Sequence, residues 1–165
     1  MINITFPDGS VRQYEAGVTG YEIAMGISPR LAEQVLAVQV KYPTEPETSR
    51  GTTIDLTRPI TRDCEIRLLK WEDDEAKKVF WHSSSHLMAE ALEALFPGVK
   101  FGIGPAIENG FYYDVDMNGR TLTDADFKAI ENKMLELARQ KQDFCRIEVS
   151  KADAMKSTLL RLSGS

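Results

Sequence analysis

The chain has 165 residues, of which 42% are hydrophobic and 27% charged, and its net charge is −5 at pH 7. These values are ordinary for a soluble globular protein, and the length suits one medium-sized domain or two small ones. No apolar run approaches the roughly 20 residues that cross a bilayer, and the N-terminus MINITFPDGS has no features of a secretory signal. The negative charge disfavours nonspecific coating of nucleic acid but permits a local RNA-binding face.

Cysteine content and the missing common motifs exclude further classes of protein. Cys64 and Cys145 are the only two cysteines, lie far apart and form no CxxC motif. Such a sparse pair is typical of free thiols in a reducing compartment, so we expect a cytoplasmic protein. The sequence contains no GxxxxGKS/T or GxGxxG phosphate-binding loop and no GxSxG serine nucleophile, the commonest nucleotide-binding and serine-hydrolase motifs.

The first seventy residues predict a compact module that opens with a β-hairpin. Residues 2–6 alternate apolar and polar side chains, an Asp-Gly turn follows, and residues 11–15 resume the extended pattern. Two short helices should come next, the first capped by Thr19 and the second by Ser28 before its proline. Further strands complete the set, with the polar segment 41–53 as a surface loop. The expected ranges are residues 20–25 and 30–34 for the helices and 35–40, 54–56 and 65–69 for the strands. This order is typical of a β-grasp, ubiquitin-like fold.

A charged joint over residues 70–78 leads into the second half of the chain, and we interpret its charges as a solvated face. A helix is predicted over residues 79–96, ended by a Pro-Gly pair. Residues 99–116 then place glycines between apolar pairs, a pattern suited to short strands whose backbones approach closely. Within this segment Phe111 and Tyr113 should share one side of a strand and Tyr112 the other.

The C-terminal part predicts a capped helix, a strand and a final short helix. Thr123 and Asp126 form a capping box for the first of these. Its apolar stripe is expected to consist of Phe127, Ile130, Met134, Leu137 and Lys141. A strand over residues 144–149 and a helix capped by Ser150, running through residues 152–155, should follow.

The only two histidines, His82 and His86, lie four residues apart in the predicted helix, beside three serines. Both imidazoles therefore project from one face, roughly opposite an arc of apolar side chains. The arc consists of Phe80, Trp81, Leu87, Met88, Ala91, Leu92 and Leu95, whereas Ser85, Ala89 and Glu90 flank the histidines. A core role for the pair is disfavoured, and a polar chemical site and a solvated surface pair both remain open. A zinc site usually needs a third and a fourth ligand.

Several longer motifs resemble a known family. The strings PDGS, VTGYEIA and DLTRPI are similar to a TGS domain, and FWHSSSHLMAEAL followed by FGIGPAIENGFYYDVD is similar to the second N-terminal domain of the bacterial threonyl-tRNA synthetase family. The resemblance implies an α+β chain with two parts. A β-grasp TGS domain would cover residues 1–70, and the N-terminal part of an incomplete α+β editing domain, with its HxxxH helix, would cover residues 71–165.

The resemblance also implies a chemistry, because the second domain in that family hydrolyses threonine-specific tRNA mischarged with serine. His82 and His86 match the histidines of its motif, beside which water attacks the aminoacyl ester at the tRNA 3′ end. The GPAIENGFYYD segment would form a wall of the cleft, with Tyr113 as a contact. Rejecting threonine while accepting serine needs a steric wall against one methyl group, worth about 1–3 kcal/mol. The threonyl-type cleft works without zinc, so no cofactor is expected.

The sequence departs from the family pattern in ways that limit this expectation. It has no third histidine and therefore no later CxxxH motif, and no class II catalytic or anticodon-binding domain follows. We expect an N-terminal fragment of a threonyl-tRNA synthetase that carries half an editing site and is inactive alone. The alternatives are a noncatalytic RNA- or protein-binding module and a trans-editing hydrolase. An incomplete domain leaves apolar faces uncovered, so we also expect self-association.

Overall fold

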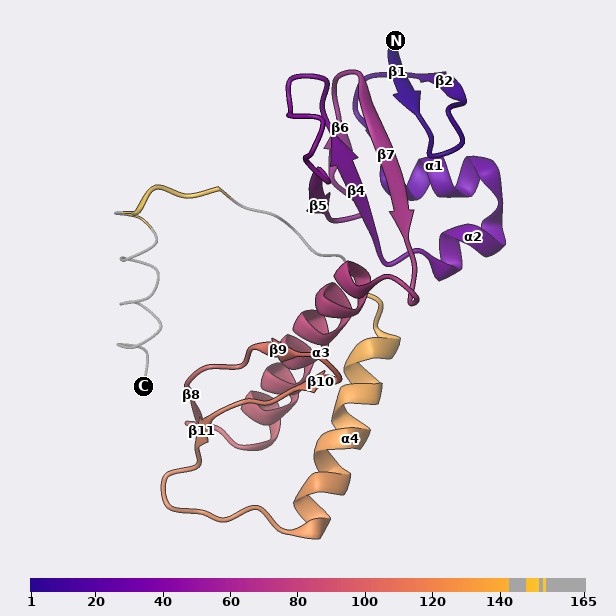
Figure 1. Ribbon diagram of the computed structural model, residues 1–165. Helices are drawn as coiled ribbons and strands as arrows, with labels where there is room; N and C mark the ends of the chain where they lie inside the picture. Colours follow the sequence, from indigo (N-terminus) through magenta and orange to yellow (C-terminus); the bar gives the residue numbers. More distant parts are fainter. Residues whose placement is uncertain (143–147, 152, 154–165) are drawn as a thin grey trace.

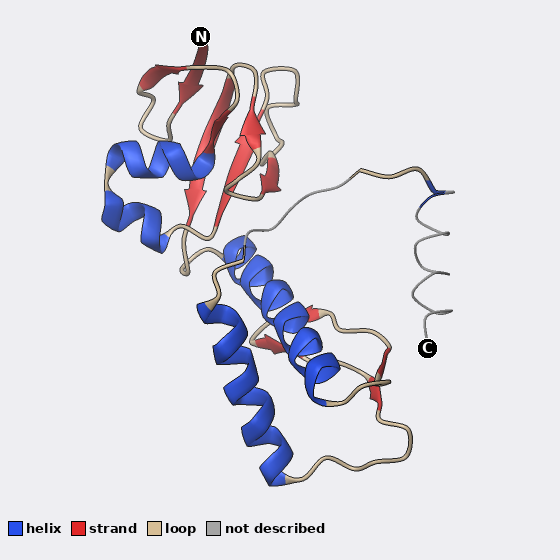
Figure 2. Cartoon of the chain, turned by 180° about the vertical axis from the view of Figure 1, so that it is seen from behind, coloured by secondary structure: helices blue, strands red, loops and turns tan. Residues whose placement is uncertain are grey.

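The computed structural model describes residues 1–142, 148–151 and 153, in which a β-sheet module precedes two long helices with short strands beside them (Figure 1, Figure 2). The first module contains β1 (Ile2–Thr5), β2 (Val11–Tyr14), β3 (Val18–Thr19), α1 (Gly20–Ile27), α2 (Pro29–Gln34), β4 (Ala37–Lys41), β5 (Thr52–Ile54), β6 (Pro59–Ile60) and β7 (Cys64–Leu69). The second part contains α3 (Asp74–Leu95), β8 (Lys100–Phe101), β9 (Ala106–Ile107), β10 (Gly110–Phe111), β11 (Val115–Asp116) and α4 (Asp124–Arg139). None of the helices within the described residues has the length and apolar character needed to cross a membrane.

The N-terminal module is a mixed sheet with its strands in the order β2-β1-β7-β4-β5. β1 runs parallel to β7, with Ile4 opposite Cys64, whereas the other pairings in this sheet are antiparallel. β3 and β6 form a separate short ladder. The chain order of hairpin, helix and further strands around a parallel β1–β7 pair is that of a β-grasp, so the predicted fold class is confirmed.

Alternate strand residues and the inner side of α1 form the core of this module. Ile4 from β1, Val38 from β4 and Ile23 from α1 are fully buried in one cluster. Burying each such side chain contributes about 1.5–3 kcal/mol. Gly20 begins α1 directly against β4, where a Cβ atom would lie only 2.8 Å from Val38 Cγ1. The missing side chain therefore lets α1 approach the sheet closely.

The predicted hairpin and helix starts of the module are largely confirmed. The β1–β2 hairpin pairs Ile2 with Tyr14. The Thr19 N–H donates to Glu22 Oε2 at 2.8 Å while the Glu22 N–H donates to Thr19 Oγ1 at 3.2 Å, which is a complete capping box for α1. Ser28 stands at the N-cap of α2 as expected, but its side chain makes no capping hydrogen bond.

Several strand ends differ from the prediction. β4 begins at Ala37 because the N–H of Val35 still donates to Leu31 O at 3.0 Å, at the end of α2. β5 begins at Thr52, inside the segment expected to be a loop, because Thr52 pairs with Val40 of the neighbouring strand. The sequence prediction lacks β3 and β6, since strands of two residues leave no periodic signal.

The second part is built on α3 and α4, which lie side by side in opposite directions (Figure 1, Figure 2). Ala91 and Leu92 of α3 are buried in one cluster with Ile130 of α4. The β9–β10 hairpin packs against α3 as well, where the ring of Phe111 lies 6.3 Å from that of Trp81. Both contacts use residues of the apolar arc that the sequence predicts for this helix.

Some side chains of α3 and α4 do not occupy their predicted positions. Ser85, expected beside the exposed histidines, is only 1% exposed, and its hydroxyl is satisfied by the helix backbone. The capping box of α4 is confirmed, but Phe127 is 52% exposed because the apolar contact with α3 begins one turn later, at Ile130. Lys141 lies beyond the end of α4 with a positive φ of 49° and cannot extend the stripe. Phe80 is also largely exposed at 39%.

α3 begins at Asp74 instead of residue 79, so the charged joint supplies the first turn of the helix. Its N-terminal turn contains Asp74 and Glu75, where negative side chains suit the positive end of the helix dipole. The start of α3 therefore lies directly after β7, within reach of the sheet.

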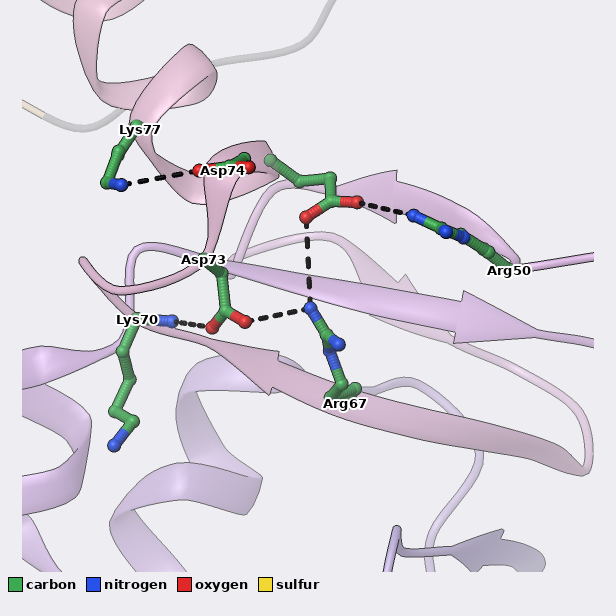
Figure 3. Close-up of polar contacts among 7 residues, drawn as sticks. Arg50, Arg67, Lys70, Asp73, Asp74 and Lys77 are labelled. Atoms are coloured by element: carbon green, nitrogen blue, oxygen red, sulfur yellow. Dashed lines mark hydrogen bonds and ion pairs between the residues drawn. The ribbon is translucent and has the colours of Figure 1, made fainter. Parts of the chain in front are cut away.

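The charges of the joint form a network with arginines of the sheet module (Figure 3). Arg67 Nη2 lies 2.8 Å from Asp73 Oδ1 and 3.8 Å from Glu75 Oε2. Arg50 Nη1 lies 3.9 Å from the other oxygen of Glu75, and the backbone N–H of Lys70 donates to Asp73 Oδ2 at 2.8 Å. The interpretation of this run as a merely solvated face is therefore wrong for Asp73 and Glu75, whose carboxylates face arginines of the sheet module, whereas Asp74 is exposed.

Of the last predicted elements, only the start of the final helix can be compared. Ser150 Oγ accepts a hydrogen bond from the Asp153 N–H at 3.2 Å, which is the bond expected of an N-cap. The strand predicted over residues 144–149 lies mostly outside the described residues, and its two described residues belong to no strand. Cys145, together with residues 152 and 154–155 of the expected helix, also lies outside them.

Candidate active site

The two histidines contact each other on an exposed side of α3. His82 Nε2 lies 3.1 Å from His86 Nε2, and the ring planes cross at 85°. A hydrogen bond between two ring nitrogens needs one donor and one acceptor, so at least one imidazole presents a neutral nitrogen there. Both side chains are exposed, which agrees with the prediction that they do not fill the core. The pair is therefore accessible to solvent and to a ligand.

Two of the three serines beside the histidines are occupied by the helix itself. Ser84 Oγ donates to the carbonyl of Phe80 at 2.8 Å, and Ser85 Oγ donates to the carbonyl of His82 at 2.7 Å. Such bonds to the preceding turn are common for serine inside helices. Ser83 is the member of the run that lines a cleft together with His82.

A cleft of about 720 Å³ lies between α3 and the β9 strand. His82 and Ser83 line it from α3, and Ala106, Ile107 and Glu108 line it from β9 and the turn that follows. The GPAIENG segment therefore does form a wall beside His82. His86 does not line the cleft and reaches it through its contact with His82.

The N-terminal half of this cleft is charged, which sequence reasoning missed. Asp74, Lys77 and Lys78 line it from the first turns of α3, and Glu108 contributes a carboxylate from the turn after β9. The available signal was the spacing of Asp74, Lys78 and His82, because residues four apart lie on the same side of a helix. This spacing was not used because the charged joint was interpreted as facing solvent.

Tyr113, expected as a substrate contact, occupies a different place. Its ring packs edge-on against Phe101 with 5.5 Å between ring centres, and it is not among the residues that line the cleft with His82. A Cβ atom on Gly104 would lie 2.5 Å from the Tyr113 ring, so the glycine makes room for it. The N–H of Asp114 donates to Ile103 O at 2.9 Å and holds the two chain segments together.

Other chemical groups in the described residues offer no competing site. Burial raises the pKa of the Cys64 thiol to about 11, which keeps it protonated and unreactive near neutral pH. Within residues 1–142, 148–151 and 153, no group of three or more histidine, cysteine, aspartate or glutamate side chains is placed to hold a metal ion. The cleft beside His82 is therefore the strongest candidate for chemistry.

Comparison with known proteins agrees with the β-grasp fold and with the family resemblance of the sequence. A family model of the TGS domain matches residues 2–70. Threonine–tRNA ligase of Parabacteroides distasonis is 57% identical over 156 residues, that of Porphyromonas gingivalis 57% over 157, and that of Phocaeicola vulgatus 56% over 156. The chain is homologous to the N-terminal part of bacterial threonine–tRNA ligase.

The match covers nearly all of this chain but only a small part of each relative. In each case the aligned region is 94% of this chain and 23% of the relative. The TGS domain accounts for the sheet module, and the histidine helix and the cleft lie in the part of the aligned region that follows it. The chain therefore spans about a quarter of the length of these ligases and includes their N-terminal region with the TGS domain.

Proposed function

We propose that the part of the chain after the TGS domain, residues 71–165, is the N-terminal part of an editing domain that hydrolyses threonine-specific tRNA mischarged with serine. The observation that carries the proposal is the cleft between His82 and the β9 wall, in a chain homologous to threonine–tRNA ligase. The partner is the 3′ end of an aminoacylated tRNA, and the compartment is the cytoplasm. Formation of the aminoacyl bond belongs to parts of such a ligase beyond this chain.

In this proposal His82 positions or activates the water that attacks the ester carbonyl. It is the histidine that lines the cleft, and a neutral imidazole can accept a proton at neutral pH. His86 orients His82 and fixes which of its nitrogens carries the proton, because their Nε2 atoms are in hydrogen-bond contact. Tyr113 would act indirectly, by packing that shapes the wall of the cleft. No metal takes part.

A chimera tests the proposal because the isolated chain lacks the CxxxH motif and should be nearly inactive. Residues 1–155 would replace the matching region of the Parabacteroides distasonis ligase. We expect this chimera to hydrolyse seryl-tRNA for threonine and His82→Ala to slow that hydrolysis about 100-fold, the lower end for loss of a general base, with aminoacylation unchanged. Lys128→Ala on the exposed side of α4 is the control. Equal hydrolysis rates with and without His82 would exclude the catalytic role of His82, and a chimera that does not hydrolyse seryl-tRNA would leave a noncatalytic RNA- or protein-binding module.

A further inference from the structure

The cleft beside His82 extends along α3 toward the start of the helix. Lys78 lies four residues before His82, so both side chains lie on the same side of α3, about 6 Å apart along the axis. Both line the cleft. A ligand that places a reactive group at His82 therefore has the Lys78 ammonium one helical turn away.

The charges on this stretch of α3 are not equivalent. Lys77 Nζ lies 3.3 Å from Asp74 Oδ1, so these two neighbours neutralise each other. The Lys78 ammonium has no ion pair or hydrogen bond among the residues that the structure describes, and it is exposed. The α3 wall therefore offers one uncompensated positive charge to a ligand.

The opposite wall offers the complementary sign. Glu108 lines the cleft from the turn after β9, its side chain is exposed, and no ion pair joins it to a described residue. Ala106 and Ile107 form the apolar remainder of that wall. The cleft thus combines a cation on α3, a carboxylate on the β9 side and the imidazole of His82.

We propose that these two charges orient an aminoacylated RNA end, with Lys78 binding the phosphate before the terminal nucleoside and Glu108 binding the α-ammonium of the aminoacyl group. The proposal rests on the proposed function, because it assumes that the ester lies at His82. An aminoacylated RNA end has an anionic phosphodiester on one side of the ester and a cationic amine on the other. The cleft presents the opposite charges, and both residues are binding residues that take no part in bond cleavage.

Binding measurements on the full chain test this without depending on hydrolysis. The probe is a short RNA hairpin with an acceptor-type end, whose 3′ serine is attached through a stable amide. We expect Lys78→Gln to weaken binding about fivefold, the upper end for one exposed ion pair, and to lower the salt slope by about 0.7, the value for one phosphate of a single strand. Lys128→Gln, on α4 outside the cleft, is the matched charge control and should change neither.

Altered RNAs assign each charge to its partner. A neutral methylphosphonate at the last linkage should weaken binding to the wild-type chain but not to Lys78→Gln. N-acetylation of the serine should weaken binding to the wild-type chain but not to Glu108→Gln, which should bind the acetylated RNA as the wild type does. Equal losses from both RNAs in every variant, or no binding of the unmodified RNA at low salt, would overturn the inference.

The two proposals can fail separately. If the chimera hydrolyses seryl-tRNA but the charge changes have no paired effect, the assignment of Lys78 and Glu108 is wrong and the editing function stands. If the paired effects appear but the chimera does not hydrolyse seryl-tRNA, the cleft binds aminoacylated RNA without catalysis. Unchanged thermal unfolding of the variants, whose replaced side chains are exposed, confirms that each still folds.

Discussion

At the scale of single residues, position in the structure separates reactive from inert groups of similar chemistry. His82 and His86 are exposed and in contact, with His82 at a cleft. Cys64 begins β7 and is buried in the core of the TGS domain, where burial is the main cause of its raised pKa and the neighbouring charge of Asp63 adds to it. The Cys64 thiol is thus kept unreactive by its surroundings, although cysteine can act as a nucleophile elsewhere.

The raised pKa of Cys64 predicts both its reactivity and its effect on stability. In a Cys145→Ser variant at pH 8, the remaining thiol should not react with a disulfide reagent in the folded state and should react fully in denaturant. Its pKa is about 11 when folded and 9.0 ordinarily, so the thiol favours the folded state fully below pH 9. That contribution is lost as the pH rises from 9 to 11. Fast reaction of the native protein would contradict the assigned burial.

At the scale of elements, α1 and α4 both begin at a capping box. In α4 the Thr123 N–H and hydroxyl donate to Asp126 at 2.9 and 2.7 Å. These hydrogen bonds lower the pKa of Asp126, with the Arg120 charge as a smaller cause. Because the same pattern fixes where the helix begins, the sequence locates this element independently of the rest of the fold.

Removing the cap of α4 should destabilise the protein in a pH-dependent way. Thr123→Ala is expected to lower the free energy of unfolding by about 1 kcal/mol, measured by urea denaturation at pH 7. The lowered pKa of Asp126 means that its contribution is present above the ordinary value of 3.8 and is lost as the pH falls through the folded value. The variant should therefore lose less stability than the wild type on acidification. Thr121→Ala, just outside the box and exposed, is the control, and equal losses at both positions would argue against the cap.

At the scale of the whole molecule, the joint between the TGS domain and α3 is a packed connection. Ala37 and Leu69 of the sheet are fully buried with Ala76 of α3, and Val79 packs against them. The Arg67 network lies beside this apolar contact (Figure 3). Small apolar side chains let α3 approach the end of the sheet closely. The ion pairs of Arg67 add contacts between the start of α3 and β7.

Removing the Arg67 ion pairs should make the joint open more often, while the free energy of unfolding of the protein changes little. Arg67→Ala removes two ion pairs whose arginine side chain is about half exposed, so the loss of unfolding free energy should stay below about 1 kcal/mol. Hydrogen exchange at residues 70–76 should become faster. Arg58→Ala, a surface arginine of the same domain, serves as the reference. Unchanged exchange in this segment would show that the apolar contact suffices.

The exposed apolar residues of the second part predict self-association. Ile103 is 68% and Ile107 49% exposed, and Tyr112 is also exposed in the same segment. Such a group favours contact between copies because it removes apolar surface from water. Sedimentation velocity should show dimers that increase with concentration, and Ile103→Ser should reduce them. A monodisperse monomer at high concentration would contradict the prediction, and Val11→Ser, an exposed apolar residue of the TGS domain, is the control.

The sequence was most informative where a signal is local. Hairpin alternation and the Thr19 and Thr123 caps depend on residues close together in the chain, and the β-grasp order was predicted from the succession of such local elements. β4 starts late because the Val35 N–H still bonds to α2, whereas the start of β5 at Thr52 was misplaced because pairing with Val40 of β4 decides where this ladder ends. The same holds for β3 and β6, whose pairing joins residues about forty positions apart.

By itself the sequence predicted two parts of the chain, placed its histidine pair away from the core and showed the resemblance to threonyl-tRNA synthetases, since these rest on element order, spacing and motif. Only the tertiary structure decided which residues share the cleft. Lys78 and Glu108 line the same cleft as His82. The Tyr113 ring packs against Phe101 and over Gly104, and Asp73 of the charged joint pairs with Arg67 of the sheet. The physical reason is that a helix face or a strand face is fixed locally, whereas its neighbours are chosen by packing between elements that are distant in the chain.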